Sequence, residues 1–93
     1  MVRPKIPRTI CGQRANICFK PNGIPMTQLE QVPLAEDEIE AMRLVDFLGM
    51  QQQEAAKSMG VSRQTLANLV KGARYKVVDS LINGKALMTN HIS

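Results

Sequence analysis

The chain has 93 residues, of which 44% are hydrophobic and 22% are charged. This length fits one small domain, and the composition is that of a folded chain and excludes general disorder. Aromatic residues make up only 3% of the chain, so aliphatic and methionine side chains must fill the core. No apolar run is long enough to span a bilayer, and the N-terminus lacks the apolar stretch of a signal peptide. We therefore expect a cytoplasmic protein without a membrane partner.

The net charge of +4 is unevenly distributed along the chain. Residues 1–24 carry basic side chains and no acidic one, whereas residues 30–54 are acidic, with Arg43 as the only base. Residues 55–93 are again basic, with Asp79 as the only acid. This order indicates a polarised molecule with one side that faces an anion, whereas net charge alone is weak evidence for nucleic acid.

All five prolines lie in the first third of the chain. Proline disfavours a helix at its own position and at the residue before it, so we expect a basic arm followed by irregular structure. The segment KPNGIP at 20–25 predicts a turn around Gly23. The preceding NICF at 16–19 is typical of a short strand, so a small β-hairpin can form here.

The first helix is predicted at residues 35–49, AEDEIEAMRLVDFLG. Apolar residues at i, i+3, i+4 and i+7 define one buried stripe. Acidic residues occupy the first turn, where they interact favourably with the positive end of the helix dipole. That stripe consists of Ala41, Leu44, Val45 and Leu48. Gly49 is a suitable C-terminal stop. Ile39 and Phe47 lie off the stripe, where they can contact the N-terminal arm or a second subunit.

Two further helices are predicted at 51–59 and 62–82. In the first, Ala55 and Ala56 are small enough for another helix to approach closely. Ser62 is a suitable N-cap for the second, which Asn83 and Gly84 close. The inward face of this last helix is predicted to consist of Leu66, Leu69, Val70, Ala73, Val77 and Leu81.

The sequence thus predicts a mainly α fold in three segments. Residues 1–33 form the basic proline-rich arm and irregular segment, 34–84 a three-helix helix-turn-helix domain, and 85–93 a C-terminal tail or short strand. Within the central segment, residues 52–71 meet the requirements of two helices joined by a tight turn. Ala56 is the small residue of the first helix, and Gly60 supplies the turn. The apolar positions that such a pair buries are Met59, Val61, Leu66 and Leu69.

The exposed face of the helix 62–82 carries residue types that contact DNA. Arginine binds guanine O6 and N7, and glutamine or asparagine binds adenine N6 and N7. The residues predicted to read bases are Arg63, Gln64, Thr65, Ala67 and Asn68. Those predicted to contact phosphates are Ser62, Lys71, Arg74 and Lys76. In the arm, Arg3, Lys5 and Arg8 are candidates for a minor groove, and the alternative is a basic tail without such a role.

Residues 36–74, EDEIEAMRLVDFLGMQQQEAAKSMGVSRQTLANLVKGAR, resemble region 4 of bacterial sigma-70 factors, which binds the promoter −35 element. With RPKIPR (3–8), FKPNGIP (19–25) and INGKAL (82–87), nearly the whole chain is similar to a family of small prokaryotic proteins, domain of unknown function 134 or uncharacterised protein family 0251. That family is predicted to bind DNA. The resemblance implies a winged-helix-like, sigma-region-4-like helix-turn-helix and, by analogy, transcription regulation. Two departures, Met50-Gln51 in place of a cap and Gly72 in place of a helix former, imply a softer helix pair.

Neither a metal site nor a catalytic site is expected. Cys11 and Cys18 are too far apart in sequence for the ligand pairs of common zinc sites, and His91 is the only histidine. We expect the two thiols to pack as small apolar groups. Because the chain shows no nucleophile–base pair, phosphate loop or metal cluster, we expect neither an enzyme nor a cofactor.

Two functions remain open from the sequence. The first is sequence-specific binding of double-stranded DNA by a transcription regulator that reads the major groove with the helix 62–82. A homodimer is plausible for such a small module, through Ile39, Phe47 or the segment GKALM at 84–88. The second is a protein–protein adaptor, in which the acidic helix 36–48 docks on a protein of the transcription machinery and the helix-turn-helix is a scaffold. An affinity that falls steeply with salt concentration would favour the DNA-binding function over the adaptor function.

Overall fold

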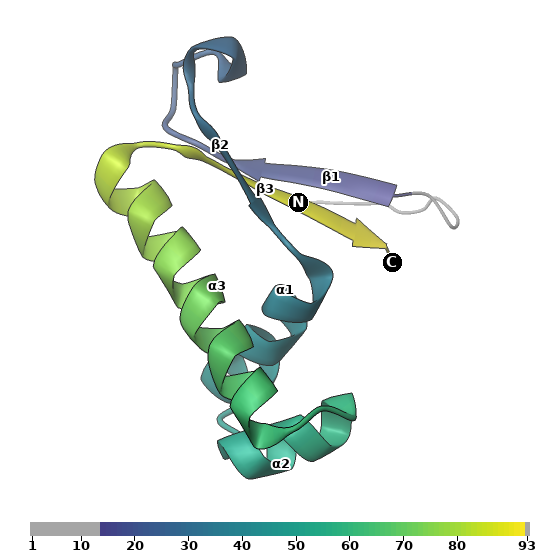
Figure 1. The fold of residues 1–93 in the computed structure, drawn as a ribbon. Coiled ribbons are helices and arrows are strands. Elements are labelled where there is room, and N and C mark those ends of the chain that lie inside the picture. Colours follow the sequence, from purple (N-terminus) through teal and green to yellow (C-terminus); the bar gives the residue numbers. More distant parts are fainter. Residues whose placement is uncertain (1–13, 93) are drawn as a thin grey trace.

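A computed structural model of the protein describes residues 14–92 (Figure 1). The arm residues Arg3, Lys5 and Arg8 and the thiol of Cys11 lie outside this range. In chain order the elements are β1 (Arg14–Phe19), the short 3₁₀ helix η1 (Met26–Gln28), β2 (Gln31–Leu34), α1 (Glu36–Met42), the π-helical η2 (Arg43–Phe47), α2 (Gln52–Met59), α3 (Arg63–Asn83) and β3 (Ala86–Ile92). Three α-helices and a small sheet confirm the mainly α fold class.

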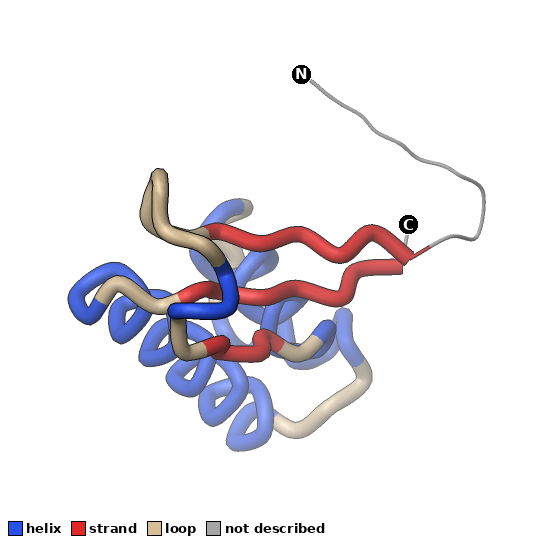
Figure 2. The backbone as a smooth tube through the Cα atoms, turned by 90° about the horizontal axis from the view of Figure 1, so that it is seen from above, coloured by secondary structure: helices blue, strands red, loops and turns tan. Residues whose placement is uncertain are grey.

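The sheet has the strand order β1-β3-β2, so β3 from the end of the chain lies between the two N-terminal strands (Figure 2). β3 runs antiparallel to β1 and parallel to β2. The strands predicted around 16–19 and 85–90 are confirmed, but β1 pairs with β3 and not with a strand across the 20–25 turn. Pro33 has no N–H to donate, which is compatible with an edge position for β2. Within the segment 84–88, Ala86 is fully buried in the middle strand and is not available to a second subunit, whereas Leu87 is half-buried.

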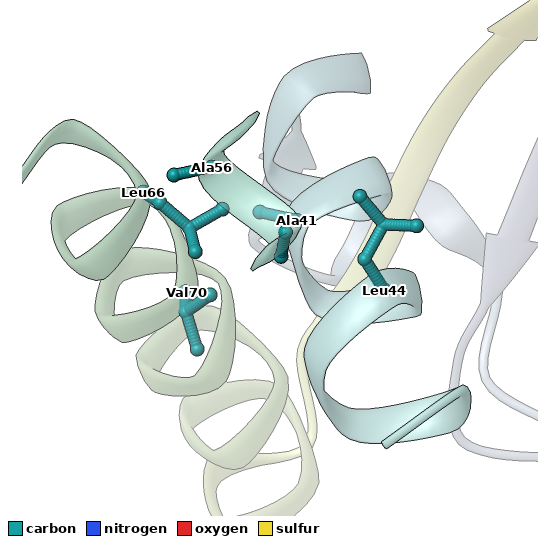
Figure 3. Close-up of a cluster of buried hydrophobic side chains, with 6 residues drawn as sticks. Ala41, Leu44, Ala56, Leu66 and Val70 are labelled. Atoms are coloured by element: carbon teal, nitrogen blue, oxygen red, sulfur yellow. The ribbon is translucent and has the colours of Figure 1, made fainter. Parts of the chain in front are cut away.

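The helical core is a cluster of small and branched side chains where α1, α2 and α3 meet (Figure 3). Alanines on α1 and α2 bring the helix backbones close together, and the larger side chains of α3 fill the space between them. The buried members are Ala41, Leu44, Ala55, Ala56, Leu66 and Val70. The predicted apolar stripes of the three helices are therefore confirmed at these positions.

The first helix departs from its prediction at its C-terminal end. After α1 the helix continues as the wider π-helical turn η2, in which the Leu48 N–H donates a hydrogen bond to the Arg43 carbonyl at 2.9 Å. A π turn holds more residues than an α turn, so it rotates the residues that follow. The prediction that Leu48 is buried is therefore wrong, since the side chain is 51% exposed. Phe47 is exposed, and Ile39 is half-buried.

The inward face of α3 is shorter than the sequence predicts. Val70 and Ala73 are buried and Leu69 and Val77 half-buried, but Leu81 is 78% exposed. The reason is that α3 runs past the helical core, and its C-terminal half continues towards the sheet (Figure 1). There the side chains that face inward are those of Val77 and the buried Ser80, whereas Leu81 lies at the rim of the molecule.

Ion pairs fasten the acidic first helix to α3. Lys76 Nζ donates to Glu38 Oε1 at 2.7 Å, and Arg74 Nε donates to Asp46 Oδ2 at 3.0 Å. Glu38 also accepts a hydrogen bond from the Ala35 N–H, 3.0 Å away, at the start of α1. Burial raises the pKa of Glu38, but the hydrogen bonds from Lys76 and Ala35 outweigh it and hold the pKa below its usual value.

We expect this lowered pKa to make the stability depend on pH in the acid range. The Glu38 carboxylate stabilises the fold fully above its pKa in the unfolded chain, near 4.5. That contribution is lost as the pH falls through the lower pKa of the folded state, because the unfolded chain binds the proton more readily. Glu38→Gln should lower the free energy of unfolding at pH 7 by about 1 kcal/mol and flatten its fall below about pH 4.5. Urea unfolding at several pH values measures both effects.

Glu54→Gln is the matched control, because it removes the same charge from an exposed position on α2. An equal change of the acid dependence in both variants would show that net charge, and not the contact with Lys76, is responsible.

Candidate nucleic-acid interface

The turn between α2 and α3 is built by the glycine that the sequence singled out. Gly60 has a φ of 72°, a left-handed conformation that an L side chain rarely adopts. Its N–H donates to the Lys57 carbonyl at 3.2 Å, and the Val61 N–H donates to the Ala56 carbonyl at 3.0 Å. These two bonds close the end of α2 in a Schellman motif. The chain then reverses, so that α2 lies across the N-terminal end of α3 (Figure 1).

Ser62 caps the start of α3, as the sequence predicts. Its Oγ accepts a hydrogen bond from the Thr65 N–H at 3.1 Å and donates one to Thr65 Oγ1 at 2.9 Å. The first turn of the helix is exposed at Ser62, Arg63, Gln64 and Thr65. The positive end of the helix dipole therefore faces outward together with a basic side chain, which favours an anion there. The Ser62 hydroxyl itself is already engaged within the cap.

The predicted base-reading residues gather on one exposed surface of α3. Arg63, Gln64, Thr65 and Asn68 are exposed, and Ala67 between them is half-buried. Gln64 Nε2 donates to Asn68 Oδ1 at 3.2 Å, so the two amides lie side by side along the helix. This bond leaves the Gln64 carbonyl oxygen as an acceptor and the Asn68 amide group as a donor for an outside partner.

A hollow of about 350 Å³ opens between the first turn of α2 and this surface. It is lined by Gln52 from α2 and by Arg63, Gln64 and Ala67 from α3. Gln52 was not among the residues predicted from the sequence, where it is one of three consecutive glutamines. Its place depends on how α2 crosses α3, which no local pattern reveals. The small Ala67 side chain forms the floor of the surface between longer polar neighbours.

The predicted phosphate-binding side chains separate into two groups. Lys71 is exposed one turn beyond Asn68, and it has no ion pair with another of the residues that the structure describes. Arg74 and Lys76, in contrast, are held by Asp46 and Glu38. The hydrogen bonds with Asp46 raise the pKa of Arg74 and hold its guanidinium against η2. Of these basic groups, Lys71 is thus the one whose charge faces outward unneutralised.

Within the described range, the sulfur atoms and acidic groups do not form a further candidate site. Cys18 is half-buried, and its Sγ lies 3.5 Å from Met26 Sδ. Among residues 14–92 no three His, Cys, Asp or Glu side chains come together as ligands for a metal ion. Nor does any helix in this range combine the length and apolar character that are needed to cross a bilayer.

Comparisons with known proteins place the chain in a family. A family model described as "Protein of unknown function DUF134" matches residues 1–91. A UPF0251 protein of Aeromonas salmonicida (strain A449) is 75% identical over 88 residues, which cover 95% of this chain and 86% of the relative. A UPF0251 protein of Vibrio cholerae (strain ATCC 39315 / El Tor Inaba N16961) is 66% identical over 87 residues, or 94% of this chain and 89% of the relative.

A more distant relative, a UPF0251 protein of Methanococcus maripaludis (strain C7 / ATCC BAA-1331), is 49% identical over 85 residues, which are 91% of this chain and 65% of that protein. No solved structure matches the chain. The high identity along almost the full length agrees with the family match, and the chain belongs to the DUF134 (UPF0251) family.

Proposed function

We propose that the chain is a sequence-specific DNA-binding protein and a transcription regulator that reads the major groove with the N-terminal half of α3. One observation carries this proposal. The exposed surface of α3 presents an arginine and two amide side chains, with the amides hydrogen-bonded side by side next to a half-buried alanine. These are the residue types that distinguish bases in the major groove. Because the tight turn at Gly60 joins α2 to α3, α3 corresponds to the second helix of a helix-turn-helix.

The chemistry of the paired amides matches an adenine. Its N6 amino group donates and its N7 accepts in the major groove. The free carbonyl oxygen of Gln64 and the free amide hydrogens of Asn68 offer the complementary pair, and the bond between the two side chains reduces the rotamer freedom that is lost on binding. Arg63 at the first turn is suited to the O6 and N7 atoms of a guanine on the neighbouring step.

Contacts with the DNA phosphates would come from residues at the edges of the same surface of α3. The first turn of α3 offers N–H groups and a helix dipole to one phosphate, and Lys71 offers an unneutralised charge to another. Each phosphate that is neutralised releases counterions, so the affinity is expected to fall as the salt concentration rises. Gln52 at the start of α2 lies where it can contact the DNA strand next to the bases that α3 reads.

The adaptor function finds less support in the contacts of the acidic helix. Glu38 and Asp46 are bound to lysine and arginine of α3, and Glu40 is paired with Arg43 at 2.7 Å. Charges that are already neutralised within the chain attract a basic partner only weakly. Glu38 of α1 and Asp46 of η2 thus fasten the first helical segment to α3.

Selection from a random double-stranded DNA pool tests the proposal. The purified wild type should enrich one motif, and Arg63→Ala and Gln64→Ala should each weaken binding to it by about 10- to 100-fold and relax the preference at one position. Arg43→Ala and Gln28→Ala are matched controls, because they truncate exposed side chains of the same types elsewhere. The proposal fails if no motif is enriched, or if all four variants bind as the wild type does.

A further inference from the structure

The C-terminal half of α3 exposes an apolar stripe that no other segment of residues 14–92 covers. Tyr75, Val78 and Ile82 follow one another at i, i+3 and i+7, which places them on one face of the helix. Their exposed fractions are 70%, 49% and 75%, and the neighbouring Leu81 is 78% exposed. A helix at the surface of a small domain normally turns polar residues outward. Contiguous apolar surface of this kind is typical of a site of interaction.

The sheet has an uncovered apolar surface next to this stripe. Ile17 and Phe19 of β1 stand opposite Thr89 and Leu87 of β3, and paired residues share one face of a sheet. The helices pack mainly against β2 and β3, which leaves β1 at the outer edge of the sheet (Figure 2). Ile17 is therefore 42% exposed and Phe19 60% exposed.

A groove of about 580 Å³ separates the two apolar surfaces. One wall is formed by Phe19 and Leu87 of the sheet, and the other by Val77 and Leu81 of α3. The stripe on α3 is thus a ridge that borders an apolar groove, and both belong to one continuous surface. This surface is self-complementary, because a two-fold axis can place the ridge of each copy in the groove of the other.

The charges at the border of this surface also favour a second copy. Lys85 Nζ lies 2.8 Å from Asp79 Oδ2, and Arg74 is paired with Asp46. Two lysines line the groove: Lys85 is neutralised within the chain, and Lys20 donates its Nζ to the Ile24 carbonyl at 2.7 Å. The repulsion between two identical surfaces is therefore limited to the charge of Lys20.

We propose that two copies of this chain associate through this surface, with the α3 stripe of each packed against the uncovered β1 face and groove of the other. The dimer stands apart from DNA binding, but it would give the protein two reading helices related by a two-fold axis. It would also supply β1 with a helix layer, which residues 14–92 of one copy do not provide.

Sedimentation equilibrium of the full chain without DNA tests the dimer. The wild type should be a dimer at about 100 μM, and Leu81→Ser and Ile17→Ser should each raise the dissociation constant at least about tenfold. Both changes shorten exposed side chains, and circular dichroism verifies that the variants fold. Phe47→Ser is the matched control, because Phe47 is 81% exposed outside this surface and its loss should leave the dimer intact.

The proposal is overturned if the wild type is monomeric at this concentration, which would assign the surface to another occupant. It is equally overturned if Leu81→Ser associates as tightly as the wild type, or if Phe47→Ser alone gives monomers. Gln64→Ala should remain a dimer, so a failure of the dimer and a failure of DNA reading are seen in separate experiments. Salt should not weaken an association that rests on apolar contacts, whereas it should weaken DNA binding.

Discussion

Replacement of Leu66 by alanine should lower the free energy of unfolding by about 3–4 kcal/mol, the largest effect that we expect from one core substitution. Leu66 is fully buried, and Figure 3 shows it among the side chains of α1 and α2. Its neighbours Ala41, Ala55 and Ala56 cannot extend into the space that the variant leaves. A cavity therefore remains, and its cost adds to the lost transfer free energy. Small domains are stable by only about 5–15 kcal/mol, so this loss removes a large share of the total stability.

Urea unfolding followed by circular dichroism measures this loss, with Leu48→Ala as the control. Leu48 is also a leucine of the helical segment, but half of its side chain is already exposed to water. Its truncation should cost about 1 kcal/mol or less. If both variants lose the same stability, the core is not centred on Leu66 as the structure places it.

The features that were predictable from the sequence are those that arise within a few residues. The Ser62 cap and the Gly60 turn depend on local backbone geometry, so each was predictable from its residue type. The same holds for the helix spans, whose apolar periodicity places Leu66 and Val70 on one face. The π turn at η2 carries no such local signal, and it displaced Leu48 from the predicted core.

Features that depend on contacts between distant segments could not be predicted from the sequence pattern. The central position of β3 depends on pairing with β1, more than sixty residues earlier in the chain, and periodicity does not report a partner. The contact between Lys76 and Glu38 likewise depends on where α1 lies along α3. Lys71 and Lys76 therefore look equivalent in the sequence, although the first faces outward and the second is engaged.

In the candidate site, too, local features were predictable from the sequence and features that depend on distant segments were not. Gln64 and Asn68 are four residues apart, so their common face was predictable, and the bond between them bears this out. Gln52 joins them only because α2 crosses the first turns of α3, and nothing in the triplet of glutamines marks the middle one. Leu81 also looked like core in the sequence because it continues the inward spacing of α3, although its side chain is 78% exposed.

The second large effect is expected at the centre of the proposed reading surface. Ala67→Glu should weaken DNA binding at least about a hundredfold, because a carboxylate facing bases and phosphates costs several kcal/mol. Ala67 lies between Arg63, Gln64 and Asn68 and forms part of the hollow that opens towards α2. A glutamate there would fill the hollow and repel the DNA backbone. The helix should persist, because glutamate is a good helix former and the position is only half-buried.

Thr27→Glu is the control that separates this local effect from the change in net charge. Thr27 is exposed in η1, which lies at the opposite end of the molecule from α2 (Figure 1). At physiological salt, charges further apart than about 8 Å are largely screened, so this variant should bind DNA nearly as the wild type does. Fluorescence anisotropy with the selected DNA measures both affinities, and thermal melting verifies both folds. Equal losses would reduce the interaction to general electrostatics, whereas a loss confined to Ala67→Glu would locate DNA binding on the exposed surface of α3.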